Sequence, residues 1–139
     1  MSAIPKAKKP EFEIGRETRL DLFRMQLELR MCEKRAFDLF LQNLIKGTSH
    51  LSLGQEAIAA GFGVAMKPDD YTFCTYRGHA HTLARGASMS GVLGELMGRE
   101  CGLLAGKGGS MHLTDVSKGV MGSYAIIGAH LPIAAGAAW

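Results

Sequence analysis

The sequence predicts an α/β fold, with a parallel sheet flanked by helices and preceded by a long N-terminal helix. An apolar stripe with helical spacing runs through the first third of the chain, and short apolar or aromatic stretches then alternate with helical segments. Most of the 18 glycines follow residue 46 and form no repeat, which favours tight turns and close backbone approaches. The 139 residues amount to one domain or part of a larger one.

Composition excludes several classes of protein. Hydrophobic residues make up 47% and charged residues 21%, as expected for a globular chain. The net charge is only +3, and much of the basic excess lies at residues 5–10, so a dedicated nucleic-acid binder is disfavoured. We expect residues 1–17 to be a flexible basic tail. The N-terminus has no apolar signal core and no apolar run is long enough to span a bilayer, so we expect a cytoplasmic protein without membrane contact.

The three cysteines, Cys32, Cys74 and Cys101, are odd in number and lack CxxC spacing. They predict neither a zinc site nor a disulfide pattern. We expect buried free thiols in a reducing compartment.

The first helix is predicted from Thr18 to Ile45, with Thr18 and Asp21 as a capping box and Gly47 as the stop. Its apolar stripe is wide. One face carries Leu20, Phe23, Leu27 and Met31, and beside it lie Leu22, Met25, Leu29, Cys32, Ala36 and Leu39.

The middle of the chain predicts helices around one short strand. Ser52 and Gln55 resemble a capping box for a helix that begins near Leu53. After a turn at residues 68–70, the aromatic and threonine-rich residues 71–76 predict a strand. Two more helices are expected over 79–85 and 89–97, ended by glycines 86 and 98.

The last part predicts a long loop over residues 102–122, because neither helical nor strand periodicity holds there. A strand, a turn and a helix beginning near Ala129 are expected to follow over residues 124–139.

The glycine-rich segment CGLLAGKGGS at residues 101–110 is not a P-loop, because its glycine spacing is one residue short and no Ser or Thr follows Lys107. Its amides are suited to face an anion, and a flexible surface loop is the alternative. His79 and His81 diverge on a helix and have no third ligand at suitable spacing, so we predict no metal site there.

Tyr76 and Arg77 lie where the predicted strand gives way to a helix. Helix N-termini attract anions, a guanidinium binds phosphate oxygens in bidentate fashion, and a phenol adds a donor. This placement favours diphosphate binding. The alternative is an arginine paired with an acidic neighbour.

Four segments together resemble one family. They are HLSLGQEA (50–57), DDYTFCTYRGHAHTLARG (69–86), GKGGSMH (106–112) and IIGAHLPIAAG (126–136). In this order they resemble the α subunit of the thiamine-diphosphate-dependent 2-oxo acid dehydrogenases, the decarboxylating first component of the pyruvate, acetoin and branched-chain complexes. The resemblance runs from Thr18 to the end, and GKGGSMH is more similar to the pyruvate and acetoin branches.

The resemblance implies roles for individual residues. Tyr76 and Arg77 match the pair that holds the cofactor diphosphate, and His50 and His79 match catalytic histidines of the active-site channel. An imidazole that titrates near neutrality can move protons or orient a carboxylate. Ala125 matches a backbone contact to the aminopyrimidine ring, and Ile127 matches the aliphatic side chain that holds the cofactor bent. Tyr124 and His130 depart from the family pattern.

The resemblance also implies thiamine diphosphate with magnesium, whose ligands are expected beyond residue 139, so residues 18–139 would be the N-terminal part of the cofactor-binding domain. No metal ligand is assigned within this sequence. The implied partners are a β subunit in an α2β2 heterotetramer, a lipoyl-bearing acyltransferase, and pyruvate, another small 2-oxo acid or acetoin as substrate. We expect this chain by itself to be inactive. A non-catalytic interaction or assembly module derived from the subunit is the alternative.

Overall fold

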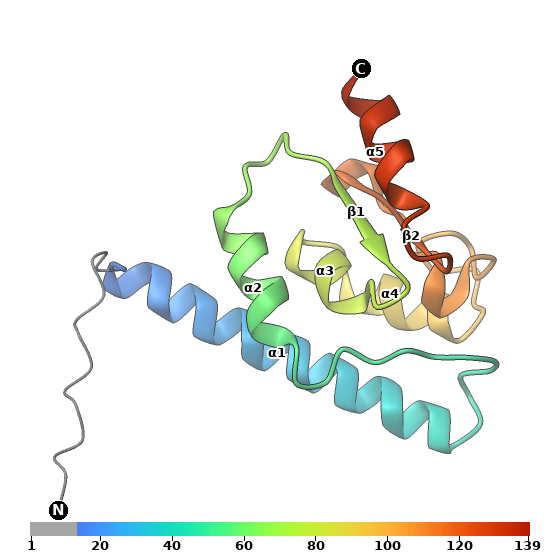
Figure 1. Cartoon of the computed structure of the whole chain (residues 1–139). Helices are drawn as coiled ribbons and strands as arrows, with labels where there is room; N and C mark the ends of the chain where they lie inside the picture. Colours follow the sequence, from blue (N-terminus) through green and yellow to red (C-terminus); the bar gives the residue numbers. More distant parts are fainter. Residues whose placement is uncertain (1–13) are drawn as a thin grey trace, which may run out of the picture.

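The computed structural model describes residues 14–139, and its elements follow the predicted α/β order. Figure 1 shows the long helix α1 beneath the rest of the chain. The other elements are α2 (Glu56–Ala65), β1 (Thr72–Thr75), α3 (His79–Ala84), α4 (Met89–Leu96), the 3-10 turns η1 (Gly109–Met111) and η2 (Val116–Lys118), β2 (Val120–Tyr124) and α5 (His130–Ala138). None of the helices among these residues is long and apolar enough to cross a membrane.

Helix α1 spans Arg16–Leu41, which confirms the long N-terminal helix but corrects its ends. The capping box predicted at Thr18 is wrong, because the N-cap is Gly15 and no side chain caps the helix. Of the predicted tail, residues 1–13 lie outside the described residues, whereas Arg16 and Glu17 are already helical. The helix ends before Ile45 because Asn43 adopts a left-handed conformation with φ of 59°.

The two sets of apolar residues on α1 differ in burial. Leu29, Cys32, Ala36 and Leu39 are buried. The face predicted as the centre of the stripe is exposed, with Phe23 at 67% and Met31 at 63%. The sequence therefore predicts the helix correctly, but not which apolar face packs inward.

Helix α2 begins at Glu56, and the capping box predicted at Ser52 is wrong. The Ser52 carbonyl accepts the Gln55 N–H at 2.9 Å, and the Ser52 hydroxyl donates to the Arg77 carbonyl at 3.4 Å. The residues before α2 therefore form a turn that reaches the end of β1. The bounds of α3 and α4 agree with the prediction to within one residue.

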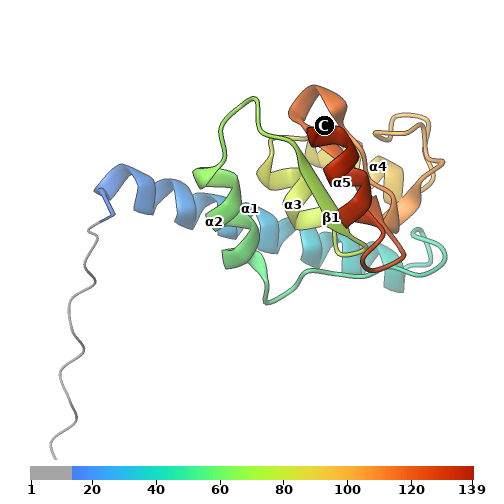
Figure 2. The same ribbon diagram turned by 45° about the horizontal axis from the view of Figure 1, so that its top comes forward.

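Strands β1 and β2 are parallel neighbours, with Phe73 opposite Gly122 and Thr75 opposite Tyr124. Parallel strands need a long crossover, and α3, α4 and the glycine-rich loop provide it. The predicted loop over residues 102–122 is wrong at its end, because β2 begins at Val120, and the strand predicted from residue 124 ends there instead. Figure 2 shows α5 on the opposite side of the strands from α3.

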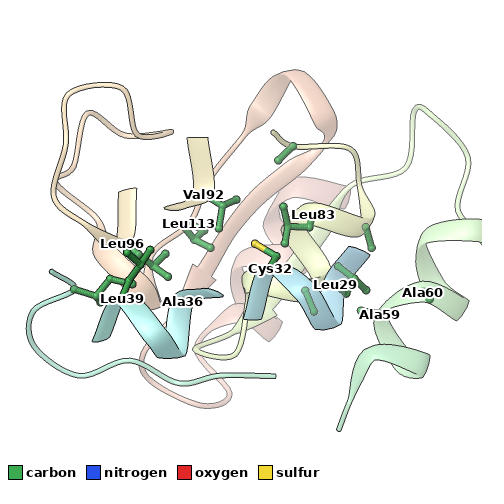
Figure 3. Packing of buried hydrophobic residues seen from close by; sticks show 14 residues of the cluster. Leu29, Cys32, Ala36, Leu39, Ala59, Ala60, Leu83, Val92, Leu96 and Leu113 are labelled. Atoms are coloured by element: carbon green, nitrogen blue, oxygen red, sulfur yellow. The ribbon is translucent and has the colours of Figure 1, made fainter. Parts of the chain in front are cut away.

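The core lies between α1 and the three helices α2, α3 and α4 (Figure 3). Its buried residues come from α1, α2, α3, α4 and the segment before η2, and they include Leu29, Ala59, Leu83, Val92 and Leu113. Burying each of the larger aliphatic side chains stabilises the fold by roughly 1.5–3 kcal/mol.

The prediction of buried thiols is confirmed for Cys32 and Cys74 and is wrong for Cys101, which is exposed. Burial, with a smaller effect from the neighbouring Glu33 carboxylate, raises the pKa of the Cys32 thiol to about 11. Burial also raises the pKa of Cys74. Both buried thiols therefore stay protonated at neutral pH and act as core residues.

Candidate functional site

The candidate site lies at the edge of the sheet where β1 and β2 end. Because the strands are parallel and Thr75 pairs with Tyr124, the residues that follow each strand leave the same edge. Tyr76 and Arg77 follow β1, and Ala125 and Ile127 follow β2. Ligands of open α/β sheets commonly bind at the carboxyl ends of the strands.

His50 joins this edge from a distant part of the sequence. Its ring lies against the ring of Tyr76, with centroids 4.4 Å apart and planes tilted by 52°. The Arg77 guanidinium carbon lies 5.8 Å from the centroid of the same tyrosine ring, within cation–π range. An imidazole, a phenol and a guanidinium are therefore neighbours at the end of β1.

Arg77 is held by backbone groups and not by acids. One terminal guanidinium nitrogen donates to the Leu51 carbonyl, and the Arg77 carbonyl accepts from the Ser52 hydroxyl. Among residues 14–139, no acidic side chain forms an ion pair with Arg77. The alternative of an acid-paired arginine is therefore not observed, and the positive charge is available to an external anion.

Helix α3 contributes less to anion binding than the sequence suggests. It covers only His79–Ala84, so few peptide dipoles align behind its N-terminus. The fit of this edge to a diphosphate rests instead on the Arg77 fork and the Tyr76 hydroxyl.

Ala125 and Ile127 leave β2 on the way to α5. Ala125 is half-buried, while Ile127 is 67% exposed and its neighbour Ile126 is 72% exposed. An aliphatic side chain so placed offers an apolar surface next to the polar groups of β1. The aminopyrimidine contact predicted for Ala125 and the wedge role predicted for Ile127 stay predictions.

His79 begins α3 but turns its ring into the protein. It is 2% exposed, its Nδ1 lies 3.2 Å from the Glu33 carboxylate of α1, and its Nε2 lies 2.7 Å from the Ser110 hydroxyl oxygen of η1. The structure thus places His79 beneath the edge that carries His50. The catalytic role predicted for it from the resemblance stays a prediction.

The glycine-rich loop binds an internal anion. The buried Glu95 carboxylate of α4 accepts backbone N–H groups from Leu104 at 2.7 Å, Gly106 at 2.9 Å, Gly108 at 2.6 Å and Gly109 at 3.0 Å. Burial alone would raise the pKa of Glu95, but these four donors outweigh it and hold the pKa below its ordinary value. The amides that suggested an external anion site are therefore already occupied.

The loop wraps Glu95 closely, which explains the glycines. A Cβ on Gly102 would lie 2.5 Å from a Glu95 carboxylate oxygen, and one on Gly106 would lie 2.4 Å from the carbonyl carbon of Gly98. Gly106 also has a φ of 74°, which residues with side chains rarely adopt.

The turn that carries His50 is fixed at two points. The Ser110 hydroxyl oxygen accepts the His50 N–H at 3.4 Å, and the Glu56 carboxylate accepts the Gly54 N–H at 3.0 Å. Arg30 of α1 binds Glu56 through two bonds of 2.5 and 2.8 Å. The hydrogen bond from Arg30 is the main reason that the pKa of Glu56 falls to about 2.

His81 points away from His79 and lines a pocket of about 250 Å3 beside β1, together with His130 of α5. Burial lowers the pKa of His81, which favours the neutral ring. Within residues 14–139, no three His, Cys, Asp or Glu side chains come together as a metal site.

Three residues that the structure places in this region were not predicted from the sequence: Glu33, Glu95 and Ser110. Glu33 and Glu95 each interrupt an apolar helix face that becomes buried, with Glu33 at 1% and Glu95 at 0% exposed. Because a buried carboxylate needs partners, such an interruption is itself a signal that the sequence contains. Ser110 carries no comparable signal.

Comparison with known proteins identifies relatives over nearly the whole chain. The family model described as "Dehydrogenase E1 component" matches residues 23–139. The chain is 36% identical over 131 residues to the α subunit of acetoin:2,6-dichlorophenolindophenol oxidoreductase of Bacillus subtilis, covering 94% of the chain and 39% of that subunit.

Pyruvate dehydrogenase E1 component α subunits are similar to the same extent. The identity is 40% over 127 residues with that of Rhizobium meliloti, covering 91% of the chain and 36% of the relative. It is 40% over 126 residues with the mitochondrial subunit of Schizosaccharomyces pombe, covering 91% of the chain and 30% of the relative. The chain thus spans between 30% and 39% of the length of these relatives.

Proposed function

Because the chain belongs to the dehydrogenase E1 component family, we propose that it is the N-terminal part of an E1 α subunit that holds thiamine diphosphate. The complete enzyme would decarboxylate pyruvate or a related 2-oxo acid, or cleave acetoin, and pass the acyl group to lipoamide. One observation carries the proposal: Arg77, Tyr76 and His50 lie together where β1 ends, and Arg77 has no acidic partner among the described residues.

Arg77 and Tyr76 would bind the diphosphate. The bond from Arg77 to the Leu51 carbonyl fixes one side of the guanidinium, and the remaining N–H groups would bind phosphate oxygens. The contact of the tilted His50 ring with Tyr76 restricts the phenol ring in turn. Little side-chain entropy is then lost when the anion binds.

His50 is the residue proposed to move a proton or to orient the substrate carboxylate. Thiamine diphosphate, when bound, supplies the carbanion chemistry. The exposed Ile127 side chain would exclude water from one side of the cofactor, and the backbone at Ala125 would orient its aminopyrimidine ring. The proposal takes magnesium as the counter-ion of the diphosphate, with ligands that the resemblance places after residue 139.

The proposed protein partners are a β subunit, in an α2β2 assembly, and a lipoyl-bearing acyltransferase. Exposed apolar side chains on α1, α2 and α5 support a partner of this kind. They include Phe23, Phe62 and Leu131, each more than 60% exposed. Isolated apolar residues are common on surfaces, but large contiguous patches mark interaction sites.

The exposed face of α1 also supports the alternative function, a non-catalytic assembly module. Leu20, Phe23, Leu27 and Met31 recur on one side of the helix and are all exposed. Such a module would keep this interface and would not bind the cofactor.

Calorimetric titration of thiamine diphosphate with magnesium separates the two functions. We expect weak or no binding to the chain alone and saturable binding when the β subunit is added. If the β subunit associates with the chain and no cofactor binds, the chain is an assembly module. If neither ligand nor subunit binds, both proposals fail.

A further inference from the structure

Three polar side chains form a line of contacts inside the protein, beneath the candidate site. Glu33 of α1, His79 of α3 and Ser110 of η1 are 1%, 2% and 8% exposed. His79 lies 3.2 Å from the Glu33 carboxylate through Nδ1 and 2.7 Å from the Ser110 oxygen through Nε2. Ser110 in turn accepts the backbone N–H of His50 at 3.4 Å. The line therefore runs from the first helix to the turn that carries His50.

The buried carboxylate of Glu33 has no explanation in packing alone. Its neighbours along the buried face of α1 are Leu29, Cys32 and Ala36, and both of its carboxylate oxygens lie 3.2 Å from His79 Nδ1. Burying a carboxylate costs free energy unless it is paired and hydrogen-bonded, and an apolar side chain at this position would avoid that cost. A carboxylate at this position is therefore best explained by what it does to His79.

The contacts define a direction of hydrogen bonding. A neutral imidazole has one donor and one acceptor nitrogen. If Nδ1–H donates to Glu33, Nε2 accepts the single Ser110 hydroxyl proton at 2.7 Å, and the Ser110 oxygen is left to accept from the His50 N–H and from the Ser49 hydroxyl, each at 3.4 Å. Glu33 thus sets the tautomer of His79, His79 orients the Ser110 hydroxyl, and Ser110 holds the backbone of His50.

Nucleophilic triads have the same order of a carboxylate, an imidazole and a hydroxyl, but the residues around Ser110 do not fit a triad. Ser110 is buried, and the neighbouring loop amides of Gly108 and Gly109 donate to Glu95. A triad needs such amides for a developing oxyanion. The line of contacts is thus suited to orientation and not to nucleophilic attack.

We propose that Glu33 and His79 are positioning residues that order His50 through Ser110. The proposal rests on the function proposed above, in which His50 acts at the cofactor, and it gives His79 a part that needs no contact with substrate. The contacts from Glu33 to Ser110 also connect α1 to the glycine-rich loop, because Ser110 directly follows Gly108 and Gly109, whose amides bind Glu95.

The test replaces the hydrogen-bond acceptor while keeping the volume. Glu33→Met removes it, Glu33→Gln retains an amide oxygen that can accept from Nδ1–H, and Ser110→Ala breaks the line next to His50. Glu28→Met, on the exposed side of α1, is the matched control. The probes are the NMR resonances of the His50 imidazole and backbone amide, the rate of tryptic cleavage after the exposed Lys107, and the melting temperature, all on the 139-residue chain.

We expect Glu33→Met and Ser110→Ala to displace the His50 resonances and to speed cleavage after Lys107 several-fold. Glu33→Gln and Glu28→Met should resemble the wild type. The melting temperature of Glu33→Met should fall, because the buried His79 Nδ1–H loses its acceptor, while the other resonances keep the dispersion of a folded protein, which separates loss of ordering from loss of folding. If Glu33→Met does not fold, Ser110→Ala decides, since it leaves the Glu33–His79 pair intact.

Unchanged His50 resonances in both Glu33→Met and Ser110→Ala would overturn the proposal, and so would a Glu33→Gln variant that behaves like Glu33→Met. These readouts need no cofactor. A displaced His50 in a protein that never binds thiamine diphosphate, even with a β subunit, would therefore refute the proposed function and leave the positioning role in place.

Discussion

Replacing Glu95 by glutamine should loosen the glycine-rich loop and lower the stability of the chain. The two carboxylate oxygens each accept two backbone N–H groups: Oε2 binds Leu104 and Gly106, and Oε1 binds Gly108 and Gly109. Glutamine keeps the shape but has one oxygen and one NH2 group. Whichever way the amide turns, two backbone donors then face another donor.

The magnitude follows from these four bonds. Each buried donor left without an acceptor costs roughly 1–3 kcal/mol, and the two surviving bonds fall from charge-assisted to neutral strength, at about 1 kcal/mol each. The neutral amide is easier to bury than the carboxylate, which offsets part of the loss. We expect a net destabilisation of roughly 3–6 kcal/mol, which for a chain of this size lowers the melting temperature by roughly 10–25 °C.

The assay is a thermal melt combined with hydrogen exchange of the loop amides. Only one pair of amides should lose protection, either Leu104 with Gly106 or Gly108 with Gly109, because the glutamine oxygen keeps the other pair. Glu100→Gln, an exposed position that follows the same helix, is the control and should melt like the wild type. A Glu95→Gln variant that melts within about 2 °C of the wild type, with all four amides still protected, would refute this reasoning.

Three further predictions concern stability and surface. The pKa of Glu56 in the folded chain is about 2, below its ordinary 4.5. The ionised carboxylate therefore contributes fully to the unfolding free energy above pH 4.5, and this contribution is lost as the pH falls through about 2. Glu56→Gln should flatten the fall in unfolding free energy measured across that pH range. Arg85 donates to the carbonyls of residues 67, 68, 70 and 118. Arg85→Ala should therefore lower the unfolding free energy, measured in urea, by roughly 2–4 kcal/mol. A change below about 1 kcal/mol would show that these four bonds do not stabilise the fold. The exposed apolar residues should make the isolated chain self-associate on a sizing column, and Phe23→Ser should reduce this; a monomeric wild type would count against it.

Local patterns predict most of the helices and β1, because each depends on neighbouring residues. Helical spacing, aromatic and threonine-rich composition and stop glycines suffice for α1, α3, α4 and β1. The helix start predicted at Thr18 fails because the helix already begins at Arg16, and the one predicted at Ser52 fails because its hydroxyl donates to the Arg77 carbonyl. β2 is not predicted because Gly122 and Ser123 have low strand propensity, and they form a strand here because they pair with β1.

The candidate site is predictable at the sheet edge and unpredictable beneath it. Tyr76 and Arg77 follow directly from the end of β1, and the resemblance adds Ala125 and Ile127, which β2 then brings to the same edge. The contact of His79 with Glu33 cannot be predicted, because nothing in the local sequence shows that its ring meets a residue of another helix. Local sequence patterns do not predict contacts between elements that are distant in the chain.

The central claim is that Arg77 binds the diphosphate of thiamine diphosphate. The direct measurement is the dissociation constant of the cofactor with magnesium, for the chain combined with its β subunit, in the wild type, in Arg77→Ala and in the exposed-arginine control Arg19→Ala. We expect weaker binding in Arg77→Ala by roughly 1.5–3 kcal/mol, the scale of a hydrogen bond to a charged group, and no change in Arg19→Ala. Equal affinity in all three proteins would contradict it.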